Sequence, residues 1–269
     1  MKIIDRPIDR NRLAIVRGGG DLATGVVYRL WRAGFSVLCL ERERPLVVRR
    51  PVSVAQAVFD GAHVIEGMRS VRIDALCDFK GGGDVAVLID EAAVCLNTLR
   101  PDLLVDAIMA KRNTGTHRGM APLVLAVGPG FHAPDEVHGV VETKRGHFLG
   151  RLITEGAAIP NTGIPGMEMG YTVQRLLRAP CDGCVLPVRE IGDSVQPGDL
   201  VATVRGRAVR ARIPGVLRGL IHPSVSVSEG AKIGDIDPRN VREHCFTITD
   251  KALAIAGGIL EAIVSIDIP

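Results

Sequence analysis

Val16-Arg17-Gly18-Gly19-Gly20-Asp21-Leu22-Ala23-Thr24-Gly25 is the stretch that decides the fold of this chain. The apolar run 13–16 before it predicts a strand, and apolar residues at helical spacing in 22–33 predict a helix after it. Three consecutive glycines allow the backbone to turn sharply and to approach a ligand closely. Because the first amides of a helix are unpaired and lie at the positive end of its dipole, the turn predicts a site for an anion such as phosphate.

The spacing of this turn matches the dinucleotide-binding fingerprint G-x-G-x-x-G/A through Gly18, Gly20 and Ala23. A second predicted strand, 36–40, ends in Glu41, where an acid that binds a ribose hydroxyl is expected. Asp21 does not fit this fingerprint, because its carboxylate would lie where the phosphates bind and could instead cap the helix. Two interpretations stay open, a phosphate site and a merely structural turn. The cofactor-binding candidates here are Gly18, Gly19, Gly20, Asp21, Thr24, Gly25 and Glu41.

The composition excludes several classes of function. A chain of 269 residues, 46% of them hydrophobic, is long enough for one large or two ordinary domains. A net charge of +3 and an aromatic content of 3% argue against a nucleic-acid partner. The start, Met1–Arg6, lacks the apolar core of a signal peptide, and no apolar run reaches membrane-spanning length. We therefore expect a cytoplasmic protein with no membrane partner and with reduced cysteines, of which Cys39 and Cys95 belong to the core.

Predicted strands and helices alternate through the first half of the chain. Further apolar runs predict strands at 63–65, 84–90, 103–108 and 122–128, while 53–59, with Ser53 as its cap, and 91–99 are predicted helices. Continuous apolar strands separated by helices are typical of a parallel sheet that is covered on both faces. The sequence therefore predicts a Rossmann-like, doubly wound α/β domain.

Basic loops follow the predicted strands of this domain. In such sheets ligands bind at the carboxyl ends of the strands. The loop 109–119 contains Lys111 and Arg112, and the loop 142–147 contains Lys144 and Arg145. Because Lys and Arg recognise phosphate and carboxylate, we expect these four residues to contact an anionic cofactor. The sequence shows no G-x-S-x-G, H-E-x-x-H or Walker lysine, so no catalytic residue is assigned.

The second informative region is an internal repeat. Gly183, Val195 and Gly198 recur 32 residues later as Gly215, Val227 and Gly230. Two halves built of short strands and tight turns should close on one another as a small β domain. The pattern resembles the barrel-sandwich hybrid of biotinyl and lipoyl carrier domains, but the hairpin 204–210 has no lysine to modify. We expect domains at 1–175 and 176–238, followed by a C-terminal helical segment at 239–269.

Two features of this part leave alternatives open. Cys181 and Cys184 form a C-x-x-C in the first turn of the repeat, which is either incidental or a soft-ligand or redox site. The predicted helix 250–266, capped by Thr249 or Asp250, has a nearly continuous apolar surface. It therefore packs into the core or forms an interface between copies of the chain, as in a homo-oligomer.

The chain resembles a known family in several motifs. Val16–Gly25, Glu142-Thr143-Lys144-Arg145-Gly146-His147-Phe148-Leu149-Gly150-Arg151 and Arg178-Ala179-Pro180 are similar to the YqeB-type accessory proteins of selenium-dependent molybdenum hydroxylases. The resemblance implies a role in maturing a molybdenum hydroxylase, whose apoprotein would be the partner, through the pterin cofactor or its sulfur or selenium ligand. A molybdopterin bears phosphate, which suits the glycine turn. The alternatives are an NAD(P)-dependent oxidoreductase, with Glu41 on a ribose or Arg42 on a 2′-phosphate, and a non-catalytic docking scaffold.

Overall fold

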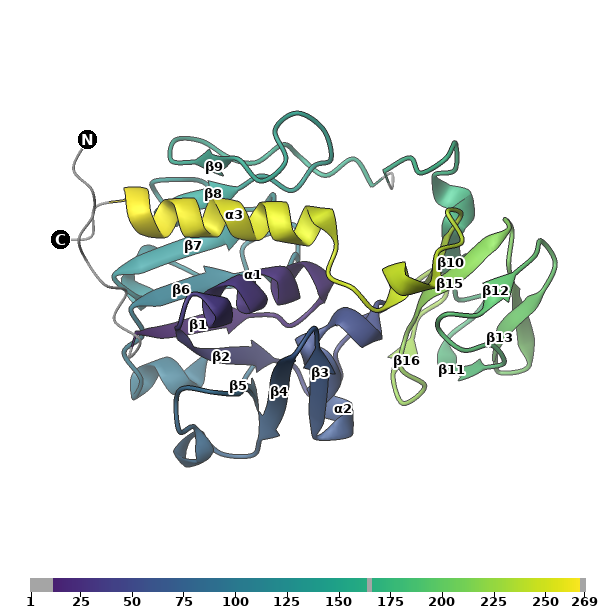
Figure 1. The fold of residues 1–269 in the computed structure, drawn as a ribbon, viewed down its shortest axis with the longest axis horizontal. Helices are drawn as coiled ribbons and strands as arrows, with labels where there is room; N and C mark the ends of the chain where they lie inside the picture. The colour runs from purple at the N-terminus through teal and green to yellow at the C-terminus, as the bar shows by residue number, and fades with distance from the viewer. Residues whose placement is uncertain (1–11, 164–165, 267–269) are drawn as a thin grey trace.

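A nine-stranded sheet forms the larger part of the molecule. The computed structural model describes residues 12–163 and 166–266 (Figure 1); Met1–Arg6, on which the signal-peptide prediction rests, lie outside them. The strand order is β3-β4-β5-β2-β1-β6-β7-β8-β9. The strands are β1 (Leu13–Arg17), β2 (Ser36–Glu41), β3 (Ala62–Ile65), β4 (Met68–Ile73), β5 (Val85–Ile89), β6 (Leu103–Asp106), β7 (Leu123–Val127), β8 (Gly139–Val141) and β9 (Leu152–Ile153).

The order of the parallel strands reverses at one point of the sheet. From β4 to β8 every neighbouring pair is parallel, and only the edge strands β3 and β9 pair antiparallel. From β1 the chain builds outward through β2 and β5 on one side, and from β6 through β7 and β8 on the other. The order therefore reverses between β1 and β6, and ligands of open α/β sheets bind at the carboxyl ends beside such a reversal.

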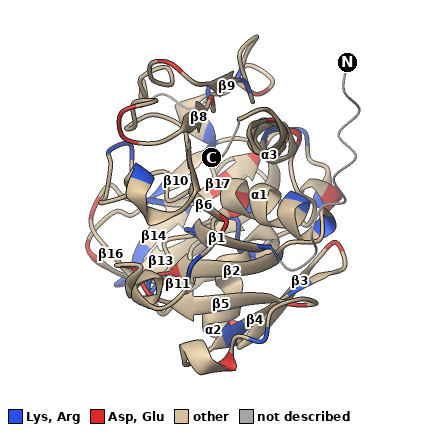
Figure 2. Ribbon diagram, turned by 90° about the vertical axis from the view of Figure 1, so that its left-hand side faces the viewer, with Lys and Arg blue, Asp and Glu red and all other residues tan. Residues whose placement is uncertain are grey.

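Two helices from opposite ends of the chain cover one face of this sheet. Helices α1 (Asp21–Arg32) and α3 (Asp250–Ser265) lie side by side across the strands (Figure 1). Both helices share a core with the strands, and the side chains of that sheet are mainly neutral (Figure 2). Thr249 caps α3, since its hydroxyl accepts a hydrogen bond from the amide of Ala252 at 3.1 Å. The predicted C-terminal helix and its cap are thus confirmed, and the helix packs into the core of the sheet.

The opposite face of the sheet corrects the prediction of a doubly wound domain. Its core contains no residue of an α-helix among those described; 3-10 turns and loops cover it. The predicted helix 91–99 is a 3-10 turn at Val94–Asn97. The Asp90 carboxylate accepts hydrogen bonds from the amides of Val94 and Cys95, both at 2.8 Å, and Ala93 has a φ of 57°. A left-handed residue at this point interrupts α-helical geometry.

The segment after β2 also differs from its prediction. The expected helix 53–59 is a 3-10 turn at Val54–Gln56 that continues as a short helix, α2 (Ala57–Asp60). Ser53 precedes it but does not cap it, because its hydroxyl donates to the carbonyl of Arg49 at 2.8 Å. That bond instead holds the turn that carries Arg49.

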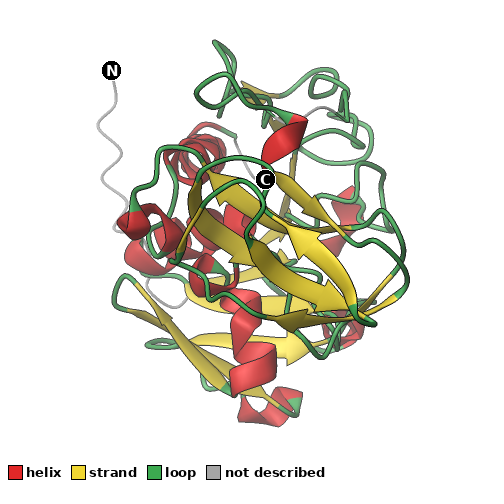
Figure 3. Cartoon of the chain, turned by 90° about the vertical axis from the view of Figure 1, so that its right-hand side faces the viewer, coloured by secondary structure: helices red, strands yellow, loops and turns green. Residues whose placement is uncertain are grey.

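The 32-residue repeat folds as two interlocking halves. Two four-stranded antiparallel sheets, in the orders β10-β17-β15-β12 and β14-β13-β11-β16, enclose one core (Figure 3). Equivalent strands begin 32 residues apart, for example at Gly183 and Gly215. The strands of one half pair with those of the other, since Gly183 lies opposite Val227 and Val195 lies opposite Gly215. The strands are β10 (Leu176–Arg178), β11 (Gly183–Pro187), β12 (Ser194–Val195), β13 (Leu200–Val204), β14 (Arg207–Arg210), β15 (Gly215–Leu220), β16 (Ser226–Val227) and β17 (Lys232–Asp237). The predicted repeat is confirmed.

The described part of the chain contains no helix that combines the length and the apolar character needed to cross a membrane.

Candidate functional site

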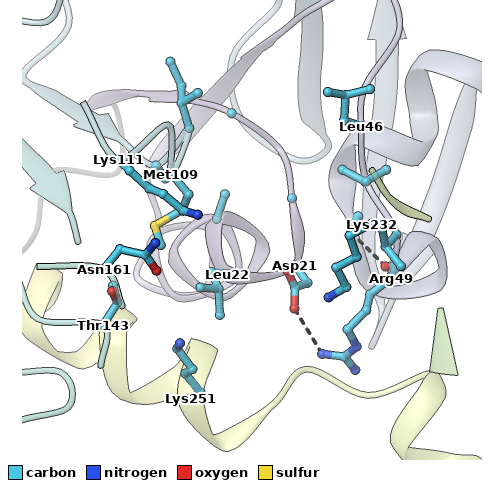
Figure 4. A pocket seen from close by; sticks show the side chains of 18 of the residues that line it. Asp21, Leu22, Leu46, Arg49, Met109, Lys111, Thr143, Asn161, Lys232 and Lys251 are labelled. Carbon is cyan, nitrogen blue, oxygen red and sulfur yellow. Dashed lines mark hydrogen bonds and ion pairs between the residues drawn. The ribbon is translucent and has the colours of Figure 1, made fainter. Parts of the chain in front are cut away.

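A cavity of about 840 Å³ opens at the reversal point of the sheet. This volume lies within the range of small-molecule sites. Figure 4 shows side chains that line it. The lining comes from the glycine turn, the ends of β2 and β6, the loop after β8, the first turn of α3 and the small sheets. Nine of the lining residues are Lys or Arg and four are Asp or Glu: Arg42, Arg49, Lys111, Lys144, Arg145, Arg175, Arg218, Lys232 and Lys251, against Asp21, Glu41, Glu168 and Asp235.

The three glycines of the turn have different roles. Gly18 has a φ of 90°, and a Cβ there would lie 2.9 Å from the Cα of Ile108. A Cβ at Gly19 would lie 2.9 Å from the amide nitrogen of Ala55. Both glycines thus allow backbone segments to pack closely. Gly20 has room beside it, since the atom nearest to its Cβ position is a methyl carbon of Val47 at 3.9 Å. All three line the cavity.

Glu41 holds the glycine turn together. One carboxylate oxygen accepts from the amide of Gly19 at 2.8 Å and the other from the amide of Arg42 at 2.8 Å. Burial raises the pKa of Glu41, and these two hydrogen bonds oppose that rise. Glu41 therefore lines the cavity, as the sequence predicted, but its oxygens and the Gly19 amide are already bound to each other.

Thr24 and Gly25 do not line the cavity. The Thr24 hydroxyl donates to the carbonyl of Gly20 at 2.9 Å and accepts from the amide of Val54 at 3.0 Å. A Cβ at Gly25 would lie 2.6 Å from the carbonyl oxygen of Ala252 in α3. The structure thus places both residues in the packing behind the turn rather than at the site.

The first turn of α1 is open to the cavity. Its N-cap is Gly20, no side chain caps it, and the capping by Asp21 that the sequence allowed is not formed. The Asp21 carboxylate instead pairs with Arg49, with 3.2 Å between Oδ2 and Nη1, and Arg49 also donates to the carbonyl of His244 at 2.9 Å. Uncapped helix amides favour an anion. Asp21 lies beside them as a negative charge.

Only part of the basic loop after β6 reaches the cavity. Lys111 lines it, whereas Arg112 does not. The Asn161 side chain, turned with its oxygen toward Lys111, accepts from the ammonium at 3.1 Å. Further along, the loop is fastened to β6, because the Thr116 hydroxyl donates to the buried Asp106 carboxylate at 2.6 Å. This anchor holds the rest of the loop away from the cavity.

The loop after β8 is built on a buried carboxylate. Glu142 accepts from the amides of Thr143 and Lys144, both at 2.7 Å, and from the amide of Ile159 at 2.8 Å. Thr143 and Lys144 line the cavity as a result. Arg145 lines the cavity too, but its guanidinium forms ion pairs with Asp250 at 3.1 Å and with Glu168 at 3.4 Å.

Lys251 is a lining residue that the sequence analysis did not select. It lies in the first turn of α3, and its ammonium has no hydrogen bond or ion pair within the described residues. Burial and the charge of Arg145 lower the pKa of Lys251. A cation in the first turn of a helix opposes the dipole. That misplaced charge is the signal in the sequence that could have identified it.

Three buried arginines, which the sequence analysis also missed, line the cavity near the small sheets. Arg49, Arg175 and Arg218 are 7%, 9% and 8% exposed. Arg175 and Arg218 both donate to Asp235 at 3.0 Å. The Nε atoms of Arg49 and Arg175 are buried with no partner among the described residues. The cluster therefore holds more donors than its acids fill.

A second carboxylate completes this cluster. Arg218 donates to Asp237 at 3.2 Å, and Arg239 donates to it at 2.6 Å. Burial alone would raise the pKa of Asp237, but the hydrogen bonds from Arg239 and the charge of Arg218 lower it to about 2. Asp237 is thus ionised and fixes Arg218.

Cys181 lies in the turn between β10 and β11, Cys184 lies in β11, and neither lines the cavity. Both are free thiols; Cys181 donates to the carbonyl of Val204 at 3.5 Å and Cys184 is exposed. The described residues contain no group of three His, Cys, Asp or Glu side chains that could hold a metal ion. Cys39 and Cys95 are buried in the core, as predicted, and burial raises the pKa of Cys95 to about 12.

Comparisons with known proteins give a homologue but no activity. No protein-family model matches the chain. Solved structures of an aspartoacylase family protein from Mesorhizobium loti and of the ectoine utilization protein EutE (DoeB) from Ruegeria pomeroyi each cover 84% of this chain and 86% and 85% of theirs, with 14% identity and TM-scores of 0.29 and 0.26. Scores this low support no inference. Over 256 residues, 94% of its length, the chain is 43% identical to YqeB of Escherichia coli (strain K12), an uncharacterized protein. The chain spans 47% of YqeB and is a homologue of about half of it.

Proposed function

We propose that the chain binds a phosphate-bearing organic cofactor of the molybdopterin type and serves, in the cytoplasm, in the maturation of a selenium-dependent molybdenum hydroxylase. One observation carries the binding part of the proposal: the cavity at the reversal point of the sheet combines an open helix N-terminus with an excess of cations. The maturation role rests on the resemblance of the glycine turn and of the loop 142–151 to the accessory proteins.

The lining residues fit such a cofactor chemically. Phosphate is favoured by the first amides of α1 and by Lys111, Lys144 and Lys251. An uncharged ring system is favoured by the apolar part of the lining, which includes Leu22 and Met109 (Figure 4). A cavity with apolar walls and a few polar groups is typical of cofactor sites.

An NAD(P)-dependent oxidoreductase is the second candidate, favoured by the strand order and by Arg42 in the lining. Against it, both oxygens of Glu41 are bound to backbone amides of its own turn. A ribose would have to displace the Gly19 amide to bind there. The third candidate is a docking scaffold. No observation of the site favours it, because docking does not require a cavity.

The test is a titration of the purified full chain with molybdopterin, NAD(H) and NADP(H), followed by calorimetry and native mass spectrometry. We expect molybdopterin to bind most tightly. Tight NADPH binding without pterin affinity would favour the oxidoreductase, and binding of none of the three would favour the scaffold.

A variant locates the ligand. Gly20→Glu is suitable because Gly20 has space beside it and a φ of −68°, so a carboxylate enters the cavity without a backbone clash. Gly257→Glu on the exposed side of α3 adds the same charge, with nothing within 4 Å of its Cβ position. Only the first should weaken molybdopterin binding. Equal affinities of the two variants would place the ligand elsewhere.

A further inference from the structure

Polar and basic side chains of the cavity lie on opposite sides of Leu22. Figure 4 shows Lys111, Thr143 and Lys251 toward one side and Arg49 and Lys232 toward the other. We call the first group the loop subsite, defined by Lys111, Thr143 and Lys251, and the second the arginine subsite, defined by Arg49, Arg175, Arg218 and Lys232.

The loop subsite has a hydroxyl that opens onto the cavity. Thr143 is only 5% exposed, and its hydroxyl makes no hydrogen bond with any residue that the structure describes. The side chain has its space because Gly128 has no Cβ; one there would lie 2.9 Å from the Thr143 hydroxyl oxygen. The residue is thus held in place by its surroundings while its hydroxyl oxygen remains accessible from the cavity. A hydroxyl beside two ammonium groups suits an anion, to which all three can donate.

The arginine subsite holds its charge through a different arrangement. Arg175 and Arg218 are fixed by Asp235, and Arg49 reaches the same place from the sheet side. Lys232, at the start of β17, is exposed to the cavity and has no acidic partner in the described part of the chain. The guanidinium groups and the ammonium of Lys232 line the same cavity, so this side also attracts an anion.

We infer that the ligand carries two separate anionic groups and bridges the large sheet and the small sheets, with one group in the loop subsite and the other in the arginine subsite. This inference rests on the proposed function and adds to it the class of ligand: a phosphate ester with a second anionic group at a distance. Leu22 lies between the two groups and would face the uncharged part of the ligand (Figure 4). A mononucleotide-like ligand with one anionic end would leave one subsite unused.

The test uses molybdopterin, which has a phosphate and an anionic dithiolene, as the probe. Lys251→Met removes a charge from the loop subsite and Lys232→Met removes one from the arginine subsite. Lys80→Met is the matched control, because Lys80 is exposed and lies outside the cavity lining. We expect each cavity variant to weaken binding at least tenfold, the double variant to weaken it by about the product, and the control to bind as the wild type does.

The possible outcomes separate this inference from the proposed function. If only one of the two cavity variants weakens binding, the ligand occupies one subsite, and the inference fails while the proposed function stands. If molybdopterin binds and neither variant weakens it, the ligand lies outside this cavity and both fail. If molybdopterin does not bind the wild-type chain, the proposed function fails and the inference falls with it. Circular dichroism of each variant verifies that it is folded.

Discussion

Asp21 is the lining residue whose replacement gives the most informative prediction. Its carboxylate lies at the open first turn of α1 and pairs with Arg49, which is 7% exposed, whereas the Asp21 side chain is 36% exposed. An anionic ligand at this turn would meet the negative charge and would compete with it for Arg49. Asp21→Asn removes the charge and keeps the size of the side chain.

The variant should bind an anion more tightly and be less stable without it. At a separation of about 5 Å, two unit charges repel by about 1–3 kcal/mol for an effective dielectric constant between those of water and a protein surface, which corresponds to about 5- to 150-fold in affinity. In the free protein, the same substitution removes the partner of the buried Arg49 and so lowers the stability of the fold. Because Asp21 is partly exposed, we expect about 1–2 kcal/mol of destabilisation, or a decrease of about 2–8 °C in Tm.

The assay is thermal unfolding of the full chain with and without inorganic pyrophosphate, together with calorimetric titration. Asp84→Asn is the control, because Asp84 pairs with Arg69 outside the cavity lining and both side chains are about half exposed. It should change neither quantity by more than about 1 kcal/mol. If Asp21→Asn binds pyrophosphate no more tightly than the wild type does, an anion does not bind at the first turn of α1. Weaker binding would mean that Asp21 itself receives a hydrogen bond from the ligand.

Three further predictions concern stability. Gly25→Ala should lower the free energy of unfolding by about 1–3 kcal/mol in urea titrations, because its Cβ would meet a carbonyl of α3, while Gly257→Ala should leave it unchanged or raise it by up to about 1 kcal/mol. The pKa of Lys251 is lowered in the folded chain, so the unfolded chain binds this proton more tightly. As the pH rises toward 10.5, the free energy of unfolding should therefore increase more for the wild type than for Lys251→Met. Equal slopes of the two curves would refute this. The pKa of Asp237 is lowered to about 2, so Asp237→Asn should lower the free energy of unfolding by about 2.5 kcal/mol at pH 7, and the difference should disappear as the pH falls from 3.8 through 2.

Local patterns in the sequence predicted the elements whose structure depends on residues close together in the chain. The strand, turn and helix around Gly18–Gly20 were predicted because the period changes from a continuous apolar run to helical spacing there. The small sheets were predicted because the repeat places glycines at equivalent turns. The helix expected at 91–99 was wrong because Asp90 binds two amides of the turn, and a side chain–backbone contact of that kind leaves no periodic signal.

The candidate site was predicted in part, for a similar reason. Lys111, Lys144 and Arg145 follow strands of the large sheet, and the rule for strand ends finds them. Arg49, Arg175, Arg218 and Lys232 reach the same cavity from segments far away in the sequence, and Lys251 arrives with a helix that follows the small sheets. Their convergence depends on how the two parts of the chain pack, which no local pattern encodes.

The pairing of α1 with α3 has a consequence for how the chain is made. A ribosome releases residues 21–32 early and residues 250–265 only after both small sheets have been synthesised. Until then one apolar face of the large sheet lacks half of its cover, and exposed apolar surface of this kind promotes aggregation. Synthesis at about 5–20 residues per second separates the end of β9 from the end of α3 by about 5–20 seconds. Because α3 is the last of these elements to be synthesised, we expect this face of the sheet to close last, when α3 docks.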